Sequence, residues 1–163
     1  MQERDLSLNK YKVLSNKQPA PSIKLSQCIT LAVLKRGRHT GTVKKILHVP
    51  SLRVLCVREE PLNTKEARLA VKDQLLLWQG ALSQQQCFLR CHGGIYNVPE
   101  GAVSIITDFH NHGSLLDLLQ SVMTLPENVI REIFPEVVEA LGLFYESSEA
   151  AFGGLSPSQV LIT

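Results

Sequence analysis

The hydrophobic positions of the chain change their spacing once, from a strand-like to a helix-like period. Before residue 110, apolar runs rich in β-branched side chains are separated by Gly, Pro and Asn, which is typical of short strands. These runs predict five strands, at residues 28–34, 42–47, 52–57, 87–92 and 102–109. The first three follow one another through short turns, so we expect them to form an antiparallel meander.

One helix is predicted inside this strand-rich part, at residues 64–78. Asn63 or Thr64 can cap its first turn, and apolar side chains recur behind the cap at three- and four-residue intervals. One face of the helix should therefore lie on the sheet. The apolar positions are Ala67, Ala70, Val71, Leu75 and Trp78.

Two further helices are predicted after residue 109. Ser114 is placed to cap the apolar stretch 115–123, and Pro126 is a first-turn proline for a helix that runs to residue 148. The second helix has a broad apolar stripe. Pro135 lies inside it and should kink it, because proline removes one backbone hydrogen bond.

Strands followed by helices predict an α+β fold, with a five-stranded antiparallel sheet and one helix in a first lobe. The polar residues 1–22 are expected to be a flexible leader. Residues 23–110 should form the sheet lobe and the connection that follows it. Residues 111–163 should form the first helices of a second, incomplete lobe.

Composition describes an ordinary globular protein, with 44% hydrophobic and 20% charged residues among 163. The net charge of +2 comes without a dense basic stripe, which argues against nucleic acid or membrane partners. No apolar run approaches the roughly 20 residues of a membrane span, and no signal-peptide pattern opens the sequence. We expect a cytoplasmic protein, with the nucleus as the alternative compartment.

The four cysteines favour reduced thiols over a disulfide framework, because three of them lie in apolar, strand-like runs. Cys87, Cys91 and His92 also offer metal-binding atoms. A zinc site is disfavoured, since no second Cys/His pair stands at a suitable distance. No metal is predicted.

Several motifs in their order resemble MAP kinase kinases. TGTVKKILHVPSLRVLCVR at 40–58 is similar to that family's glycine-rich loop and the next two strands, and HGSL at 112–115 to its G-G-S-L. PENVIREIFPEVVEALGLFY from Pro126 is similar to its I-P-E helix, and the register continues to P-S-x-(I/V)-L at Leu161. The resemblance spans residues 25–163. It implies a protein-kinase-like N-lobe followed by the first helices of a C-lobe that stops at the catalytic loop.

The resemblance also implies where a nucleotide would lie. Arg36, Arg38 and Gly41 stand where the family has three glycines, which let the backbone approach phosphates, and Val43 follows. Arginine therefore stands at two of the three positions, which leaves two hypotheses open. The arginines could bind phosphate directly, or, as we prefer, they are exposed surface charges.

The catalytic lysine of the family corresponds to Arg58, and Cys56 lies two residues before it. Arginine keeps the charge but not the compact shape of lysine. Asp73 is the best match for the helix glutamate that usually pairs with this lysine. An ion pair between Arg58 and Asp73, holding the helix against the sheet, is the role we expect.

The segment after the last strand resembles the hinge that meets adenine. Thr107 corresponds to the gatekeeper, and Asp108 to His110 offer backbone groups for an adenine edge. Asp108-Phe109 is not the magnesium-binding D-F-G motif, because it precedes the catalytic loop instead of following it.

The closing stretch FGGLSPSQVL aligns with H-R-D-x-K-P-S-N-(I/V)-L, and its chemical residues differ. The family's general base, phosphate-binding lysine and magnesium-binding asparagine correspond to Gly154, Ser156 and Gln159. These changes remove a positioned base and transition-state charge stabilisation. They predict a chain that is not an enzyme, with ATP binding left open and a magnesium site disfavoured.

The first functional hypothesis is therefore a catalytically inactive MAP kinase kinase-like pseudokinase that regulates a protein partner, such as a kinase of a MAP kinase cascade. The apolar stripe of the last helix would lie uncovered in an incomplete lobe and could drive dimerisation. A second hypothesis is a divergent ATP-binding kinase with weak serine, threonine or tyrosine kinase activity. A third is a fragment without independent function.

Overall fold

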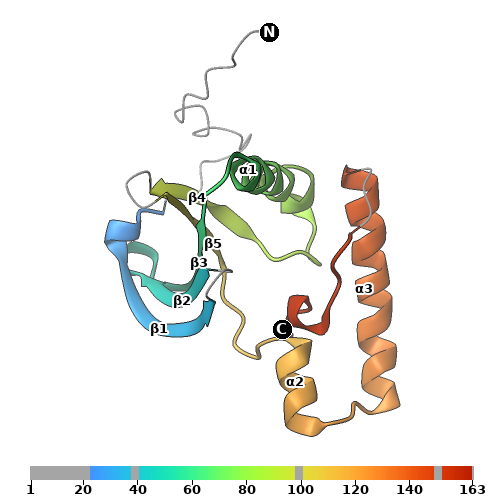
Figure 1. The fold of residues 1–163 in the computed structure, drawn as a ribbon. Helices are drawn as coiled ribbons and strands as arrows, with labels where there is room; N and C mark the ends of the chain where they lie inside the picture. The colour runs from blue at the N-terminus through green and yellow to red at the C-terminus, as the bar shows by residue number, and fades with distance from the viewer. Residues whose placement is uncertain (1–22, 38–40, 98–100, 149–151, 163) are drawn as a thin grey trace, which may run out of the picture.

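The computed structural model describes residues 23–37, 41–97, 101–148 and 152–162 (Figure 1). The leader predicted at residues 1–22 lies outside these ranges. Strands come first and helices dominate the later half, as predicted. The elements are β1 (Cys28–Gly37), β2 (Gly41–His48), β3 (Arg53–Pro61), α1 (Lys65–Gln79), β4 (Cys91–Asn97), β5 (Ala102–Asp108), α2 (Leu115–Val122) and α3 (Glu127–Ser148).

The five strands form one antiparallel sheet in the order β1-β2-β3-β5-β4. The predicted meander of the first three strands and the five-stranded sheet are confirmed. Alternating side chains of each strand point to opposite faces, so each face carries its own hydrophobic cluster. We call the face covered by α1 the inner face and the opposite one the outer face.

The inner face holds the cluster that joins α1 to the sheet. Val71 and Leu75 of α1 are buried there against Val103 and Ile105 of β5. The outer-face cluster consists of Ile46, Leu55, Val57 and Ile106. Leu55 and Val103 are completely buried, which places the two centres of the core in the middle of the sheet.

Helix α1 begins where the sequence indicates. Thr64, rather than Asn63, is the N-cap, and its hydroxyl oxygen accepts the backbone N–H of Ala67 at 3.1 Å. The helix lies very close to β4, because a Cβ built on Gly94 would stand 2.6 Å from Cδ1 of Leu75. A glycine at position 94 therefore allows the helix and the strand to approach each other.

The fourth strand was predicted at residues 87–92 and lies instead at Cys91–Asn97. The predicted strand stopped before Gly93 and Gly94, and glycine weakens strands. In the structure they belong to the strand, with a bulge between Cys91 and Gly93 where the pairing register shifts. Gly93 has a φ of +134°, a conformation that other residues rarely adopt.

The two later helices lie beyond the end of β5, and α3 contacts the short 3-10 helix Ala81–Gln84 that follows α1 (Figure 1). Ser114 and Asp117 form a capping box at the start of α2, in which the Asp117 carboxylate accepts the Ser114 backbone N–H at 2.7 Å. Helix α3 continues through Pro135. None of its residues is buried, and its Phe144 ring meets the edge of Phe152 with 5.1 Å between centroids.

The last described residues return to the start of α2. Leu115 donates its backbone N–H to Val160 O at 2.8 Å, and Ile162 donates to Gly113 O at 3.0 Å. These bonds place the closing segment beside α2. No helix in the described ranges is long and apolar enough to cross a membrane.

Candidate functional site

The sheet register brings four predicted site residues together on the inner face. Val43 of β2 lies opposite Arg58 of β3, and Cys56 of β3 lies opposite Thr107 of β5. Directly opposed residues of neighbouring antiparallel strands share a face. Arg58 also lies opposite Ile105, which belongs to the α1 cluster. These residues therefore line the side of the sheet that α1 covers.

Arg58 is held by three neighbours on this face. Its Nε lies 2.7 Å from Oε1 of Glu60, and its guanidinium reaches Oε1 of Gln74 at 3.5 Å. The guanidinium carbon also stands 5.9 Å from the centre of the Trp78 ring, within cation–π range. The Nε contact is an ion pair without hydrogen-bond geometry, since Nε is buried with no hydrogen-bond partner.

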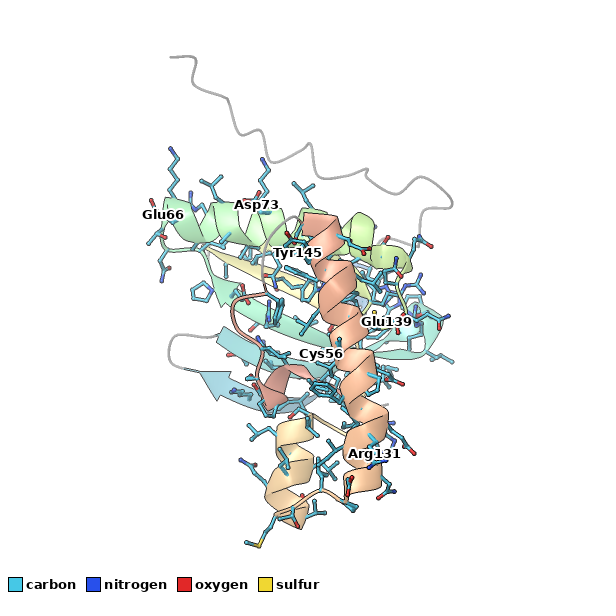
Figure 2. All side chains as sticks on the ribbon, turned by 90° about the vertical axis from the view of Figure 1, so that its right-hand side faces the viewer. Cys56, Glu66, Asp73, Arg131, Glu139 and Tyr145 are labelled. Atoms are coloured by element: carbon cyan, nitrogen blue, oxygen red, sulfur yellow. The ribbon has the colours of Figure 1, made fainter. Side chains whose placement is uncertain are left out.

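The predicted pair of Arg58 with Asp73 is wrong. Asp73 is exposed, and Figure 2 shows it on the side of α1 turned away from the sheet. Helical geometry explains the difference. Residues 71, 74, 75 and 78 share one helix face at three- and four-residue spacing, so Gln74 points toward the sheet where Val71 and Leu75 are buried. The apolar spacing of α1 already carried the signal that favours Gln74 over its neighbour.

The thiols of the inner face are kept protonated by their surroundings. Burial raises the pKa of Cys56, while a hydrogen bond with the Thr107 side chain and the charge of Arg58 act in the opposite direction. Cys91 lies on the other side of Thr107, and burial raises its pKa as well. A protonated thiol is a weak nucleophile, so this face offers shape and polarity and no reactive sulfur.

Side chains around the predicted hinge bind one another. One carboxylate oxygen of Asp108 lies 2.7 Å from the Arg53 guanidinium and 2.8 Å from Nε2 of His92, whose side chain is almost fully buried. The Asp108 backbone N–H donates to Arg90 O at 3.1 Å. This hydrogen-bonded group fixes the ends of β3 and β4 to the end of β5.

A cation that the sequence analysis missed lies beside the hinge. Nζ of Lys45 stands 4.2 Å from the centre of the Phe109 ring. Strand alternation could have indicated it, because Lys45 is two residues beyond Val43 and therefore on the same face. His110 is partly buried at the start of the connection to α2.

The glycine-rich region is described in part. Gly41 has a φ of +76°, and a Cβ built on it would stand 1.6 Å from Glu59 O, so only glycine fits where β2 starts against β3. Arg36 lies in β1 opposite Thr42. Arg38 lies outside the described residues. The roles of these residues toward a nucleotide stay predictions.

The three altered catalytic-loop positions gather at a short 3-10 turn, Pro157–Gln159. Oε1 of Gln159 accepts the Ser156 backbone N–H at 2.9 Å, so this amide caps its own turn. A Cβ built on Gly154 would meet nothing nearer than the Gln159 amide nitrogen at 3.9 Å. The turn lies beside α2, apart from the predicted residues Val43, Cys56, Arg58 and Thr107 of the sheet.

Metal binding finds little support in this geometry. The magnesium-binding position is occupied by Gln159, whose carbonyl oxygen already accepts a backbone hydrogen bond. In the part of the chain that the structure describes, no three His, Cys, Asp or Glu side chains come together as metal ligands would.

Comparison with known proteins finds similarity to plant protein kinases. No model of a known protein family matches the chain. Three curated proteins of Arabidopsis thaliana do: Mitogen-activated protein kinase kinase 3 (25% identity over 126 residues), kinase kinase 1 (28% over 141) and kinase kinase 2 (29% over 161). The alignments cover 76%, 86% and 98% of this chain. The chain spans less than half of these relatives, namely 24%, 38% and 43% of their lengths.

One sequence-based prediction is overturned by these relatives. The altered loop residues predicted that the chain is not an enzyme, yet the proteins it matches are protein kinases, which are enzymes. That prediction rested on the loss of three side chains at a single turn. The similarity extends over most of the chain, so three altered side chains do not establish that the chain is inactive.

Proposed function

Since this chain is a MAP kinase kinase-like relative of plant kinases, we propose that it serves as a regulatory interaction module in a kinase cascade. Its partner is a protein kinase of that cascade, and the contact surface is the apolar face of α3. The observation that carries this proposal is the exposure of that face in the described structure.

Four apolar side chains of α3 stand in solvent, and we call them the α3 stripe. At 3.6 residues per turn they fall within roughly 80° of arc, on one side of the helix. They are Ile130 (47% exposed), Phe134 (65%), Val138 (49%) and Tyr145 (62%). Figure 2 shows α3 in front of the sheet, with Tyr145 near its end.

A contiguous apolar stripe of this kind is unusual on a protein surface and is typical of a contact surface. An amphipathic helix also fits a partner groove through residues at such spacing. Phe134 has the largest exposed fraction in the stripe. Full burial of such a side chain contributes about 1.5–3 kcal/mol. With 65% of the residue still exposed, a partner that covers it gains roughly 1–2 kcal/mol.

The test is a binding titration of the chain with a purified MAP kinase, comparing Phe134→Ser with Glu132→Ser. Both variants place serine at an exposed position of α3, but Glu132 lies on the other side of the helix. We expect saturable binding that Phe134→Ser weakens about five- to thirtyfold and that Glu132→Ser leaves unchanged. Equal affinities for the two variants, or no saturable binding, would refute the proposal.

A second copy of the chain could occupy the α3 stripe instead of a kinase. Light scattering over a range of concentrations measures the oligomeric state and so distinguishes the two partners. If the chain forms dimers that Phe134→Ser dissociates and binds no kinase, the α3 stripe joins two copies of the chain. The kinase partner is then wrong.

A second candidate function is nucleotide binding by a divergent kinase. It is favoured by the inner-face group of Val43, Cys56 and Thr107 with the cation of Arg58 beside it. The relatives are kinases, which supports the same candidate.

Titration with a fluorescent ATP analogue tests this candidate. Arg58→Met should abolish saturable binding, because it removes the charge beside the inner face. Lys44→Met is the matched control, since Lys44 pairs with Glu59 at 2.6 Å and alternates to the outer face. Binding that survives Arg58→Met, or that is absent from the unaltered chain, contradicts the candidate.

A further inference from the structure

The closing turn contains a serine whose surroundings suit covalent modification. Of the eight prolines in the chain, only Pro157 follows a serine or threonine. The pair Ser156-Pro157 is thus the single Ser/Thr-Pro dipeptide of the sequence. Kinases that are directed by proline require a proline directly after the serine or threonine that they modify.

The backbone at Ser156 is extended. Its φ of −142° and ψ of 158° are those of an extended strand. Proline favours this conformation in the residue before it, because its ring clashes with a helical neighbour. A kinase that binds its substrate as an extended segment therefore needs little rearrangement here.

The residues on both sides of Ser156 are accessible. Residues 152–155 and 157–159 are exposed, and Ser156 itself is partly buried. Leu155, directly before the serine, is 49% exposed. Only one backbone hydrogen bond closes the turn, from the Gln159 N–H to Ser156 O at 2.9 Å. A second bond joins the Ser156 N–H to Oε1 of Gln159 at 2.9 Å, and the residues after the turn are held at the start of α2. Access to Ser156 therefore requires that these two turn bonds open.

We propose that Ser156 is a phosphorylation site for a proline-directed serine/threonine kinase. Oγ of Ser156 attacks the γ-phosphorus of ATP, and the new O–P bond forms as the bond to the β-phosphate oxygen breaks. ADP leaves, and the hydroxyl proton passes to the aspartate of the modifying kinase. This inference does not depend on the α3 stripe.

Phosphorylation would rearrange the turn. Oγ of Ser156 now lies 2.8 Å from Oγ of Ser158 and donates to Oε1 of Gln159 at 3.4 Å. A phosphate oxygen only accepts hydrogen bonds and carries negative charge. The Ser158 hydroxyl can donate to it, whereas Gln159 must present its amide nitrogen instead of its oxygen. The modification therefore breaks the hydrogen bond between the Ser156 N–H and Oε1 of Gln159.

The experiment incubates the chain with a purified proline-directed kinase and Mg-ATP, and locates phosphate by fragmentation mass spectrometry. We expect one phosphate on Ser156, complete loss of it in Ser156→Ala and in Pro157→Ala, and retention in the matched control Ser158→Ala. Circular dichroism verifies that each variant is folded, and fragmentation of the unaltered chain identifies the site independently of any variant.

A synthetic peptide of residues 150–163 shows whether the sequence around Ser156 is a kinase substrate when the fold does not restrict access to it. If the peptide is phosphorylated and the folded chain is not, the fold blocks the serine and the proposal fails. Phosphate on another residue, or full incorporation into Pro157→Ala, also overturns it.

Discussion

Replacing Gly94 by alanine should disturb the contact between α1 and the sheet. The added Cβ would stand 2.6 Å from Cδ1 of Leu75 and 3.4 Å from Cγ2 of Val103. Carbon atoms in good contact are about 3.5–4.0 Å apart. Leu75 is 7% exposed and Val103 is fully buried. Little free space is available, so either Leu75 adopts a strained rotamer or the helix moves outward.

The magnitude follows from two opposing effects. Overpacking of a core costs about 1–3 kcal/mol. Replacing a glycine lowers the conformational entropy of the unfolded chain, which stabilises the fold by about 0.4–1 kcal/mol. We therefore expect Gly94→Ala to lower the free energy of unfolding by about 0–2.6 kcal/mol.

A double-mutant cycle isolates the contact. Leu75→Ala alone should cost about 2–5 kcal/mol, because it leaves a cavity in the inner-face cluster. In the double variant the new methyl of residue 94 meets no leucine. The combined loss should then be smaller than the sum of the single losses by roughly 0.5–3 kcal/mol.

Urea unfolding measures these differences as shifts of the midpoint at constant slope. Gly142→Ala is the matched control, since a Cβ built on this α3 glycine meets no atom within 4 Å. It should stabilise the chain by up to about 1 kcal/mol, as alanine favours helix. Additive losses in the cycle, or a stabilising Gly94→Ala, would show that glycine is not required for the approach of α1 to β4.

Three further substitutions test the polar contacts. Asp108→Ala should lower the free energy of unfolding by about 1–3 kcal/mol, because the almost buried His92 loses its carboxylate partner. A lower melting temperature measures this loss. The hydrogen bond from the Ser114 hydroxyl lowers the pKa of Asp117, so its stabilisation is present above the unfolded pKa and is lost as pH falls through the folded pKa. In Asp117→Asn the melting temperature should therefore change less with pH in the acid range than in the unaltered chain. Arg131→Ala should change unfolding by less than about 0.5 kcal/mol, since the Arg131–Glu127 pair is 77% exposed on both sides. A larger loss on thermal melting would contradict that estimate.

The sheet and the helices were predictable because local pattern and tertiary burial agree. Leu55 and Val57 of β3 have the two-residue spacing of one strand face, and both are buried on the outer face. Val71 and Leu75 have the four-residue spacing of a helix face, and both are buried on the inner face. Where each residue's local preference matches its environment in the fold, the sequence alone is sufficient.

The fourth strand was misplaced because its glycines depend on a distant helix. Gly94 weakens a strand by its own preference, and only the close approach of Leu75 explains its presence there. The group of Arg53, His92 and Asp108 was missed for a similar reason. Its members come from three strands, and the register that brings them together is not visible from spacing along the chain.

The surroundings of Arg58 bear directly on the choice between the two candidate functions. Its charge is balanced by Glu60 at 2.7 Å, and its guanidinium is shared with Gln74 and Trp78 of α1. A phosphate could engage this cation only in competition with the Glu60 carboxylate, and any shift of the guanidinium would alter its contacts with α1. Nucleotide binding at this site should therefore be coupled to the position of α1. An interaction through the α3 stripe makes no such demand, because α3 lies apart from these contacts. Glu60→Gln should consequently strengthen nucleotide binding in the fluorescent titration and leave the affinity for a protein partner unchanged.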